Sequence, residues 1–233
     1  MKARIAGLLY LFVIVAGVFA EIFVRQRLVV AGDAAATAHN ILAHEMLYRL
    51  GFAAELLACA CNMPLAFIFY DLFKVVNRSF AWLVVLFTLL GTAVEAAALL
   101  ADYAPLVLLG GSRSLAAIGA AQLQGLAYAS LQVFEKGFAV ALVFFGFYCL
   151  ALGYLIVRSI FFPRIIGVLL GIEGLCYLTN SFANFLAPVF AAHFFPYLAA
   201  SAVAEISLML WLLVVGVNAQ RWKEQAGAAG IQA

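Results

Sequence analysis

The chain has 233 residues, of which 68% are hydrophobic and 10% are charged, and its mean hydropathy is +1.13. A soluble globular domain of this length needs more polar surface than this composition provides, so that class of protein is excluded. The net charge of +2 at pH 7 is too small to indicate a nucleic-acid partner, and a lipid bilayer is the expected environment.

Six segments are long and apolar enough to cross a membrane as helices, since about 20 apolar residues span the hydrocarbon core. In chain order they cover residues 5–24, 47–70, 80–103, 127–157, 164–187 and 197–218. No polar linker divides the chain. The sequence therefore predicts an all-α fold, with a single domain over residues 1–233 that forms a polytopic bundle of six transmembrane helices.

The basic residues between the spans indicate how the bundle is oriented, because cytoplasmic loops carry an excess of lysine and arginine. If the N-terminus is cytoplasmic, eight basic residues lie on that side: Lys2, Arg4, Lys74, Arg78, Arg158, Arg164, Arg221 and Lys223. The loops of the opposite side then hold Arg25, Arg27 and Arg113. This bias predicts that both termini are cytoplasmic.

Each predicted span contains one glutamate, although a charged side chain at mid-membrane costs roughly 2.5–3.5 kcal/mol and rarely faces lipid. Most of them lie about eight or nine residues from the outer end of their span, which is roughly 12 Å along a helix. We therefore expect a layer of carboxylates in the outer half of the bundle. The residues are Glu21, Glu55, Glu95, Glu135, Glu173 and Glu205.

Few basic residues accompany these carboxylates inside the spans, namely Arg49 and Lys136. The remaining carboxylates must be protonated, hydrogen-bonded, hydrated or paired with a bound cation. The sequence thus predicts an internal site for a cation, a proton or a cationic small molecule, in a transport or sensing role. Besides the six glutamates, its candidate ligand-binding residues are polar side chains at helical spacing and one base: Asn62, Tyr177, Asn180 and Arg49.

Two alternatives stay open. The first is an intramembrane enzyme that acts on a lipid with a divalent metal, for which the candidate ligands are His44, Glu55, Glu95 and Glu205. The second is a ligand-free assembly subunit, in which the polar side chains join helices. An enzyme is the less favoured class, because no serine lies in a G-x-S-x-G context. The sequence does not indicate an oligomeric state.

The second half of the chain also carries a family resemblance, in residues 144–156, 158–159, 162–170, 204–206 and 211–213. This pattern resembles a bacterial family of small six-span membrane proteins catalogued as a domain of unknown function. The resemblance implies the architecture and a bacterial cytoplasmic membrane, and it implies no activity. Among the glutamates, Glu205 lies within the pattern, whereas Glu173 stands where the pattern implies an apolar residue.

Overall fold

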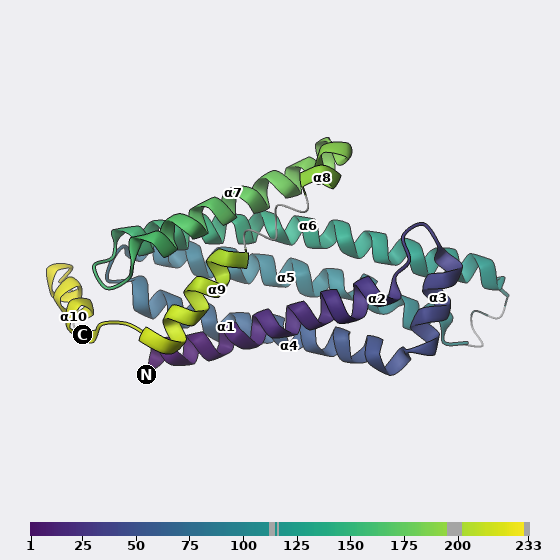
Figure 1. Ribbon diagram of the computed structural model, residues 1–233, viewed down its shortest axis with the longest axis horizontal. Coiled ribbons are helices and arrows are strands. Elements are labelled where there is room, and N and C mark those ends of the chain that lie inside the picture. The colour runs from purple at the N-terminus through teal and green to yellow at the C-terminus, as the bar shows by residue number, and fades with distance from the viewer. Residues whose placement is uncertain (112–114, 116, 195–201, 231–233) are drawn as a thin grey trace. The chain divides into compact units, whose positions relative to one another are not determined.

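The computed structural model describes residues 1–111, 115, 117–194 and 202–230, and within these residues every regular element is helical. The all-α prediction is therefore confirmed. The elements are α1 (Lys2–Val18), η1 (Phe19–Arg25), α2 (Gln26–Leu28), α3 (Ala34–Ala43), α4 (Glu45–Phe73), α5 (Arg78–Leu109), α6 (Ala120–Arg158), α7 (Arg164–Leu186), α8 (Pro188–Phe194), α9 (Ala202–Leu210), η4 (Trp211–Val215) and α10 (Ala219–Ala228), as labelled in Figure 1.

Five helical stretches of the described residues are long and apolar enough to cross a membrane: Lys2–Leu28, Glu45–Phe73, Arg78–Leu109, Ala120–Arg158 and Arg164–Leu186. Each contains most or all of one predicted span, and most extend beyond it. A sixth stretch, Ala202–Val215, passes the same test together with Ala219–Ala228, which follows after a bend of 105°. The protein is thus a multi-pass helical membrane protein. The orientation of its termini stays a prediction.

The sixth predicted span differs most from the structure. Residues 197–201 of that prediction lie outside the described part of the chain. At its other end the helix stops at Val215 rather than at residue 218, because Gly216 has a φ of +74°, which is left-handed backbone that favours glycine.

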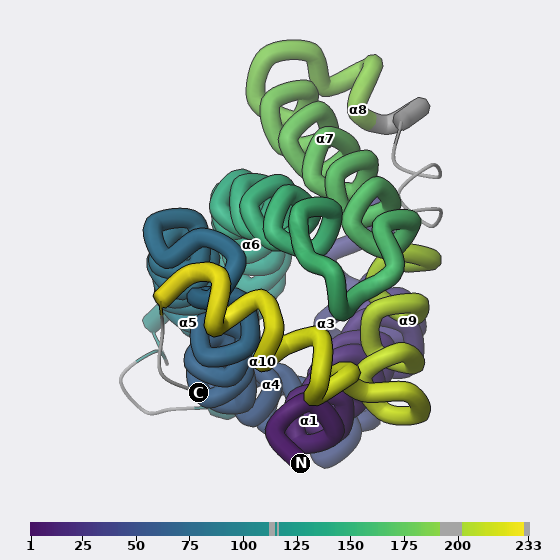
Figure 2. The backbone as a smooth tube through the Cα atoms, turned by 90° about the vertical axis from the view of Figure 1, so that its left-hand side faces the viewer, coloured from purple at the N-terminus to yellow at the C-terminus, as the bar shows by residue number. Residues whose placement is uncertain are grey.

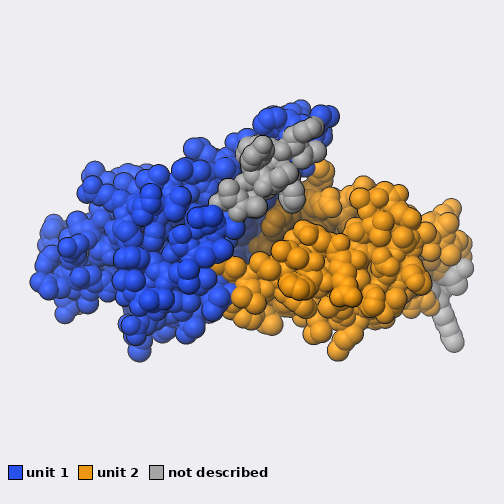
Figure 3. Space-filling view, viewed as in Figure 1, with its two compact units in different colours: residues 1–11, 61–92, 139–233 blue, residues 12–60, 93–138 orange. Residues whose placement is uncertain are grey.

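The chain packs into two compact units, which are coloured separately in Figure 3. Unit 1 comprises residues 1–11, 61–92 and 139–233, and unit 2 comprises residues 12–60 and 93–138. Helices α1, α4, α5 and α6 each contribute residues to both units. The units are described one at a time below, and the single domain over residues 1–233 stays a prediction.

In unit 1, α6 and α7 approach closely because glycines face each other along both helices. A Cβ atom added to Gly153 would lie 2.6 Å from the carbonyl oxygen of Gly167, and one added to Gly174 would lie 2.6 Å from that of Gly146. The two glycines of each helix are seven residues apart, so they share a face. Small residues of this kind let membrane helices pack backbone to backbone.

The last span of unit 1 packs against its first. A Cβ atom added to Gly7 of α1 would lie 2.8 Å from the backbone nitrogen of Leu213 in η4. Figures 1 and 2 both show α9, which leads into η4, running beside α1. Helix α9 also contacts α7. Two carboxylate-bearing helices of unit 1, α7 and α9, are therefore neighbours.

Unit 2 has a core of buried apolar side chains: Val24, Leu28, Ile41, Tyr48, Leu106 and Leu131. Gly51 lets α4 approach η1, since a Cβ atom there would meet Val24 at 2.8 Å. The short helix α3 begins after Asp33, whose carboxylate accepts a hydrogen bond from the backbone N–H of Ala36 at 2.8 Å. This packing fixes η1 and α4 beside each other, and both carry charged side chains.

Candidate functional site

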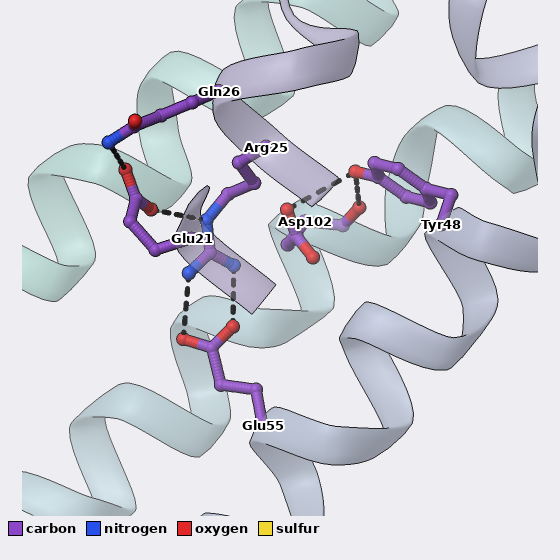
Figure 4. Close-up of polar contacts among 6 residues, drawn as sticks. All are labelled: Glu21, Arg25, Gln26, Tyr48, Glu55 and Asp102. Carbon is purple, nitrogen blue, oxygen red and sulfur yellow. Dashed lines mark hydrogen bonds and ion pairs between the residues drawn. The ribbon is translucent and has the colours of Figure 1, made fainter. Parts of the chain in front are cut away.

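The charged side chains of unit 2 gather around Arg25, the last residue of η1. Its Nε donates to Glu21 at 2.9 Å, and its two terminal nitrogens donate to the two carboxylate oxygens of Glu55 on α4. Figure 4 shows this two-pronged contact between Arg25 and Glu55. We call Glu21, Arg25 and Glu55 the arginine cluster.

The side chains of the Arg25–Glu55 pair are mostly buried. The side chains are 14% and 4% exposed, respectively, and the ring of Phe134 lies 4.6 Å from the guanidinium carbon. A planar guanidinium that donates two bonds to one carboxylate is the strongest geometry for such a pair. The protein therefore supplies its own counter-charge for Glu55.

Arg25 corrects the sequence interpretation, which placed it in an outer loop. The helix continues through η1 and α2 to Leu28, so Arg25 remains part of the spanning segment. The one available signal was its spacing of four residues from Glu21, which places the two side chains on the same helix face. Its tie to Glu55, 30 residues away, has no local signature.

Arg49 was the basic residue named as a candidate for the site, but the structure places it elsewhere. It is exposed, its Nε donates to Glu45 at 2.8 Å, and its Nη1 donates to the Tyr103 hydroxyl at 3.0 Å. No span glutamate of the described chain is paired with it. The expectation that Arg49 compensates the internal carboxylates is therefore wrong.

A second buried polar contact of unit 2 lies between α4 and α5. The hydroxyl of Tyr48 donates toward the backbone oxygen of Asp102, and its distance to the Asp102 carboxylate is 3.2 Å. Both residues are almost completely buried. Asp102 was not among the predicted site residues, although it lies within the predicted span 80–103, one residue before its end.

The other two glutamates of unit 2 differ in burial. Glu95 on α5 is half-buried and lies beside the Cys59 thiol of α4. Glu135 on α6 is exposed, so the expectation that it faces the interior is wrong. Asn62 is half-buried and belongs to unit 1.

In unit 1 two carboxylates face each other without an arginine between them. Glu173 of α7 lies opposite Glu205 of α9, and the Tyr177 hydroxyl donates to Glu205 at 3.2 Å. Tyr10 of α1 and Tyr148 of α6 are buried and lie close enough to interact electrostatically with both acids. We call Glu173 and Glu205 the acidic pair.

Glu173 has unusual surroundings. It is 1% exposed, and neither of its carboxylate oxygens has a hydrogen-bond partner among the described residues. No base in the described part of unit 1 pairs with either acid. The nearest base along α7 is Arg164, nine residues away or about 14 Å along the helix.

The polar face of α7 continues beyond the acidic pair. Asn180 lies seven residues after Glu173, which places both on one face, with Tyr177 between them. Asn180 Oδ1 and the neighbouring Ser181 Oγ are buried without a partner in the described parts of the structure. The predicted stripe of Glu173, Tyr177 and Asn180 is thus brought together on α7, with Glu205 opposite.

The candidate metal ligands do not assemble. Across the described chain, no group of three or more His, Cys, Asp and Glu side chains is positioned to hold a metal ion. His44 is exposed and ends α3, while Glu55 is paired with Arg25. Glu205 belongs to unit 1, whereas His44, Glu55 and Glu95 belong to unit 2.

The six span glutamates therefore form two groups. Glu21, Glu55, Glu95 and Glu135 belong to unit 2, and the acidic pair belongs to unit 1. A single shared compartment in the outer half of the bundle stays a prediction.

The sequence model of a family described as "Domain of unknown function (DUF4386)" matches residues 5–216. No curated protein and no solved structure matches the chain. The matched region includes both the arginine cluster and the acidic pair, and it ends at the glycine that precedes α10.

Proposed function

The chain belongs to the DUF4386 family, a domain of unknown function, and from that premise we propose that this multi-pass membrane protein binds a proton or another cation at the acidic pair. The binding residues are Glu173, Glu205 and Tyr177. The protein would use this site for transport or sensing in the cytoplasmic membrane of a bacterium, with both termini in the cytoplasm.

The observation that carries the proposal is the isolation of Glu173. Its two buried oxygens make no hydrogen bond of ordinary geometry with the described residues, and their polar neighbours are the Glu205 carboxylate and the Tyr177 hydroxyl. Of these two carboxylates Glu173 is buried and Glu205 is half-buried, and at close range ionisation of both is unfavourable unless a positive charge is added. Within the described residues the chain offers no such charge, so a proton or a bound cation is the species that balances the site.

The chemistry of the site supports a hard, oxygen-preferring ligand. Carboxylate and hydroxyl oxygens are the groups that alkali and alkaline-earth cations prefer, while thiolate and imidazole suit softer metals. Tyr177 has one proton, which it donates to Glu205, and its oxygen remains available as an acceptor. The same oxygens also form a short path along which a proton can be shared.

The proposal is tested with Glu173→Gln, which keeps the shape of the side chain and removes its acidity. The purified full chain in neutral detergent is titrated with Na⁺, K⁺, Mg²⁺ and acid while the thermal unfolding midpoint is followed. We expect one of these additions to stabilise the parent protein and to lose its effect in Glu173→Gln and in Glu205→Gln. Infrared difference spectra separate a proton from a metal cation, because only a proton produces the C=O band of a carboxylic acid.

Glu135→Gln is the matched control, since Glu135 is also a span glutamate but is exposed and lies in unit 2. It should retain the full response to the stabilising cation. If the double variant Glu173→Gln/Glu205→Gln responds like the parent to every cation and to acid, the binding proposal is wrong. The ligand-free assembly subunit would then be the better description.

A further inference from the structure

One end of unit 1 is built around the bend before α10. Gly216 ends η4, and its backbone N–H donates to the carbonyl oxygen of Trp211 at 2.7 Å. The following helix then leaves at 105° to the span. A helix that turns away sharply after a membrane span is placed to run along the membrane surface rather than through it.

Helix α10 is held in this crosswise position by specific contacts. The indole Nε1 of Trp222 donates to the carbonyl oxygen of Leu72 at the end of α4, at 2.8 Å. The Gln225 side-chain oxygen accepts from the backbone N–H of Ile160, in the turn between α6 and α7, at 3.1 Å. Helix α10 therefore covers the helix ends of unit 1 as a fixed element.

A pocket of about 310 Å³ lies where this bend faces the turn between α6 and α7. Its apolar wall is made by Phe161, Phe162, Trp211 and Val215, and its polar edge by Asn218 and Arg221. This volume is at the small end of the range for ligand sites, roughly 300–1,000 Å³. The pocket is large enough for a headgroup with its first carbon atoms and too small for a complete lipid.

The polar edge of the pocket favours an anion. Arg221 is exposed, and its guanidinium Nη1 donates to the carbonyl oxygen of Ile160 at 3.4 Å. No carboxylate of the described residues neutralises it, so its charge is available to a ligand. Helix α7 begins here after Pro163, which provides no side-chain cap, and its first backbone N–H groups add positive potential.

The ring of Trp211 is part of the apolar wall. Trp211 lines the pocket, while its indole Nε1 is buried away from open space and has no acceptor in the described part of the chain. The ring therefore offers an apolar surface to the first acyl carbons of a lipid. Arg221 and Trp211 thus suit two neighbouring parts of one amphipathic molecule.

The charge of unit 1 agrees with an anionic partner. Its sequence contains eight basic and four acidic residues, and two of those acids are the acidic pair. A third, Asp71, is already paired with Lys2 and Lys74. The bases are the residues that the sequence places on the cytoplasmic side, where anionic lipids attract exposed lysine and arginine.

We propose that this pocket binds the headgroup of an anionic phospholipid. The phosphate faces Arg221 and the start of α7, and the glycerol ester region and first acyl carbons lie against Trp211, Phe162 and Val215. The inference does not depend on the proposed function, because it uses none of the residues of the acidic pair.

The test uses the full chain in neutral detergent, with native mass spectrometry and thermal unfolding as readouts. Phosphatidylglycerol, phosphatidylcholine and inorganic phosphate are titrated separately. We expect phosphatidylglycerol to bind and to raise the unfolding midpoint, and the other two to have little effect. Arg221→Gln should weaken phosphatidylglycerol binding about tenfold, which corresponds to the lower range for a hydrogen bond to a charged group.

Lys223→Gln is the matched control, because Lys223 is an exposed base of the same helix that does not line this pocket. It should bind phosphatidylglycerol like the parent. Trp211→Ala, which removes a ring from the apolar wall, should also weaken binding.

Three results would overturn the inference. Equal weakening by Lys223→Gln and Arg221→Gln would indicate diffuse surface attraction. Equal binding of phosphatidylcholine would contradict an anion site. Binding of inorganic phosphate with the affinity of the lipid would show that the apolar wall takes no part.

Discussion

The arginine cluster of unit 2 and the acidic pair of unit 1 start from the same sequence feature, a glutamate within an apolar span, and reach opposite electrostatic solutions. Glu55 meets a guanidinium that donates to both of its oxygens, and the two charges cancel inside the protein. Glu173 meets another carboxylate and a tyrosine, and its oxygens make no hydrogen bond of ordinary geometry with the described residues. In the first arrangement the chain itself supplies the counter-charge of Glu55, while the second is the place where we propose that a proton or another cation binds.

The difference shows that the depth of a carboxylate in a span does not reveal its role. What matters is whether the chain itself provides the counter-charge. Removing charge should therefore have opposite effects in the two regions, and four sets of substitutions test this.

The largest effect is expected for Arg25→Leu, which leaves Glu55 buried without its counter-charge. Breaking a buried pair in this way typically costs about 3–5 kcal/mol of unfolding free energy. The exposed neighbour Arg27 provides the control Arg27→Leu, which should change stability by less than about 0.5 kcal/mol. Unfolding with a denaturing detergent measures both.

The double variant Arg25→Leu/Glu55→Leu should recover most of the lost stability, because replacing both members of a buried pair by apolar residues is often neutral. If the single and double variants are equally unstable, Arg25 contributes through packing and not through charge. The contrast between the two regions would then lose its electrostatic basis.

The second prediction concerns the acidic pair, where removal of an acid should stabilise the protein when no cation is added. Glu173→Leu removes two unsatisfied oxygens from a buried position, which should raise the unfolding free energy by about 1–3 kcal/mol. In the parent, a cation at 100 times its Kd would add about 2.7 kcal/mol, and Glu173→Leu should show no such gain. A loss of stability without cation would mean that Glu173 has a partner inside the protein.

Some of this contrast could be predicted from the sequence. The spacing of Glu173, Tyr177 and Asn180 predicts that these residues share one helix face, because periodicity depends only on the local helix. Five of the six spans followed from apolar length for the same reason. The contact of Glu173 with Glu205 required the packing of α7 on α9, and no local pattern encodes it.

The role of Arg25 could not be predicted, since a charged residue after twenty apolar ones has the appearance of a helix end. Whether such a residue ends the span or pairs within it depends on a glutamate on another helix. Glu135 shows the converse. It was expected inside the bundle as one of the six span glutamates, yet its side chain is exposed. Helical spacing determines which residues share a face of the helix. The direction in which that face points depends on the packing of the whole bundle.

The third prediction tests whether close packing of α7 on α6 positions Glu173. In Gly167→Ala the new Cβ would lie 2.6 Å from the Gly153 carbonyl oxygen, so the helices must separate at a cost of about 1–3 kcal/mol. Gly171→Ala is the control on the same helix, since nothing lies within 4 Å of its Cβ. That variant should be neutral or stabilise the helix by roughly 0.5–1 kcal/mol.

The Gly167→Ala variant should also weaken the response to the stabilising cation, because α7 carries one side of the acidic pair. If stability falls while the cation response stays at the parental level, the position of α7 against α6 does not matter for the site. The acidic pair would then depend on α7 and α9 alone.

The smallest effects are expected for the tyrosines, and they compare the two regions most directly. Tyr177→Phe removes one hydrogen bond to Glu205, which should cost about 1 kcal/mol at most. Tyr48→Phe removes the hydroxyl that contacts both the backbone and the carboxylate of the buried Asp102, which should cost about 1–3 kcal/mol.

The two tyrosine variants should differ in whether an added cation restores their stability. At the acidic pair, an added cation can satisfy the Glu205 oxygen that Tyr177 leaves, so the unfolding midpoint of Tyr177→Phe should approach that of the parent as cation is added. The unfolding midpoint of Tyr48→Phe should stay below that of the parent at every cation concentration. The contact that this variant loses lies in unit 2, where Arg25 already provides a fixed positive charge. Equal repair of both variants would show that the cation acts on the whole protein and not at the acidic pair.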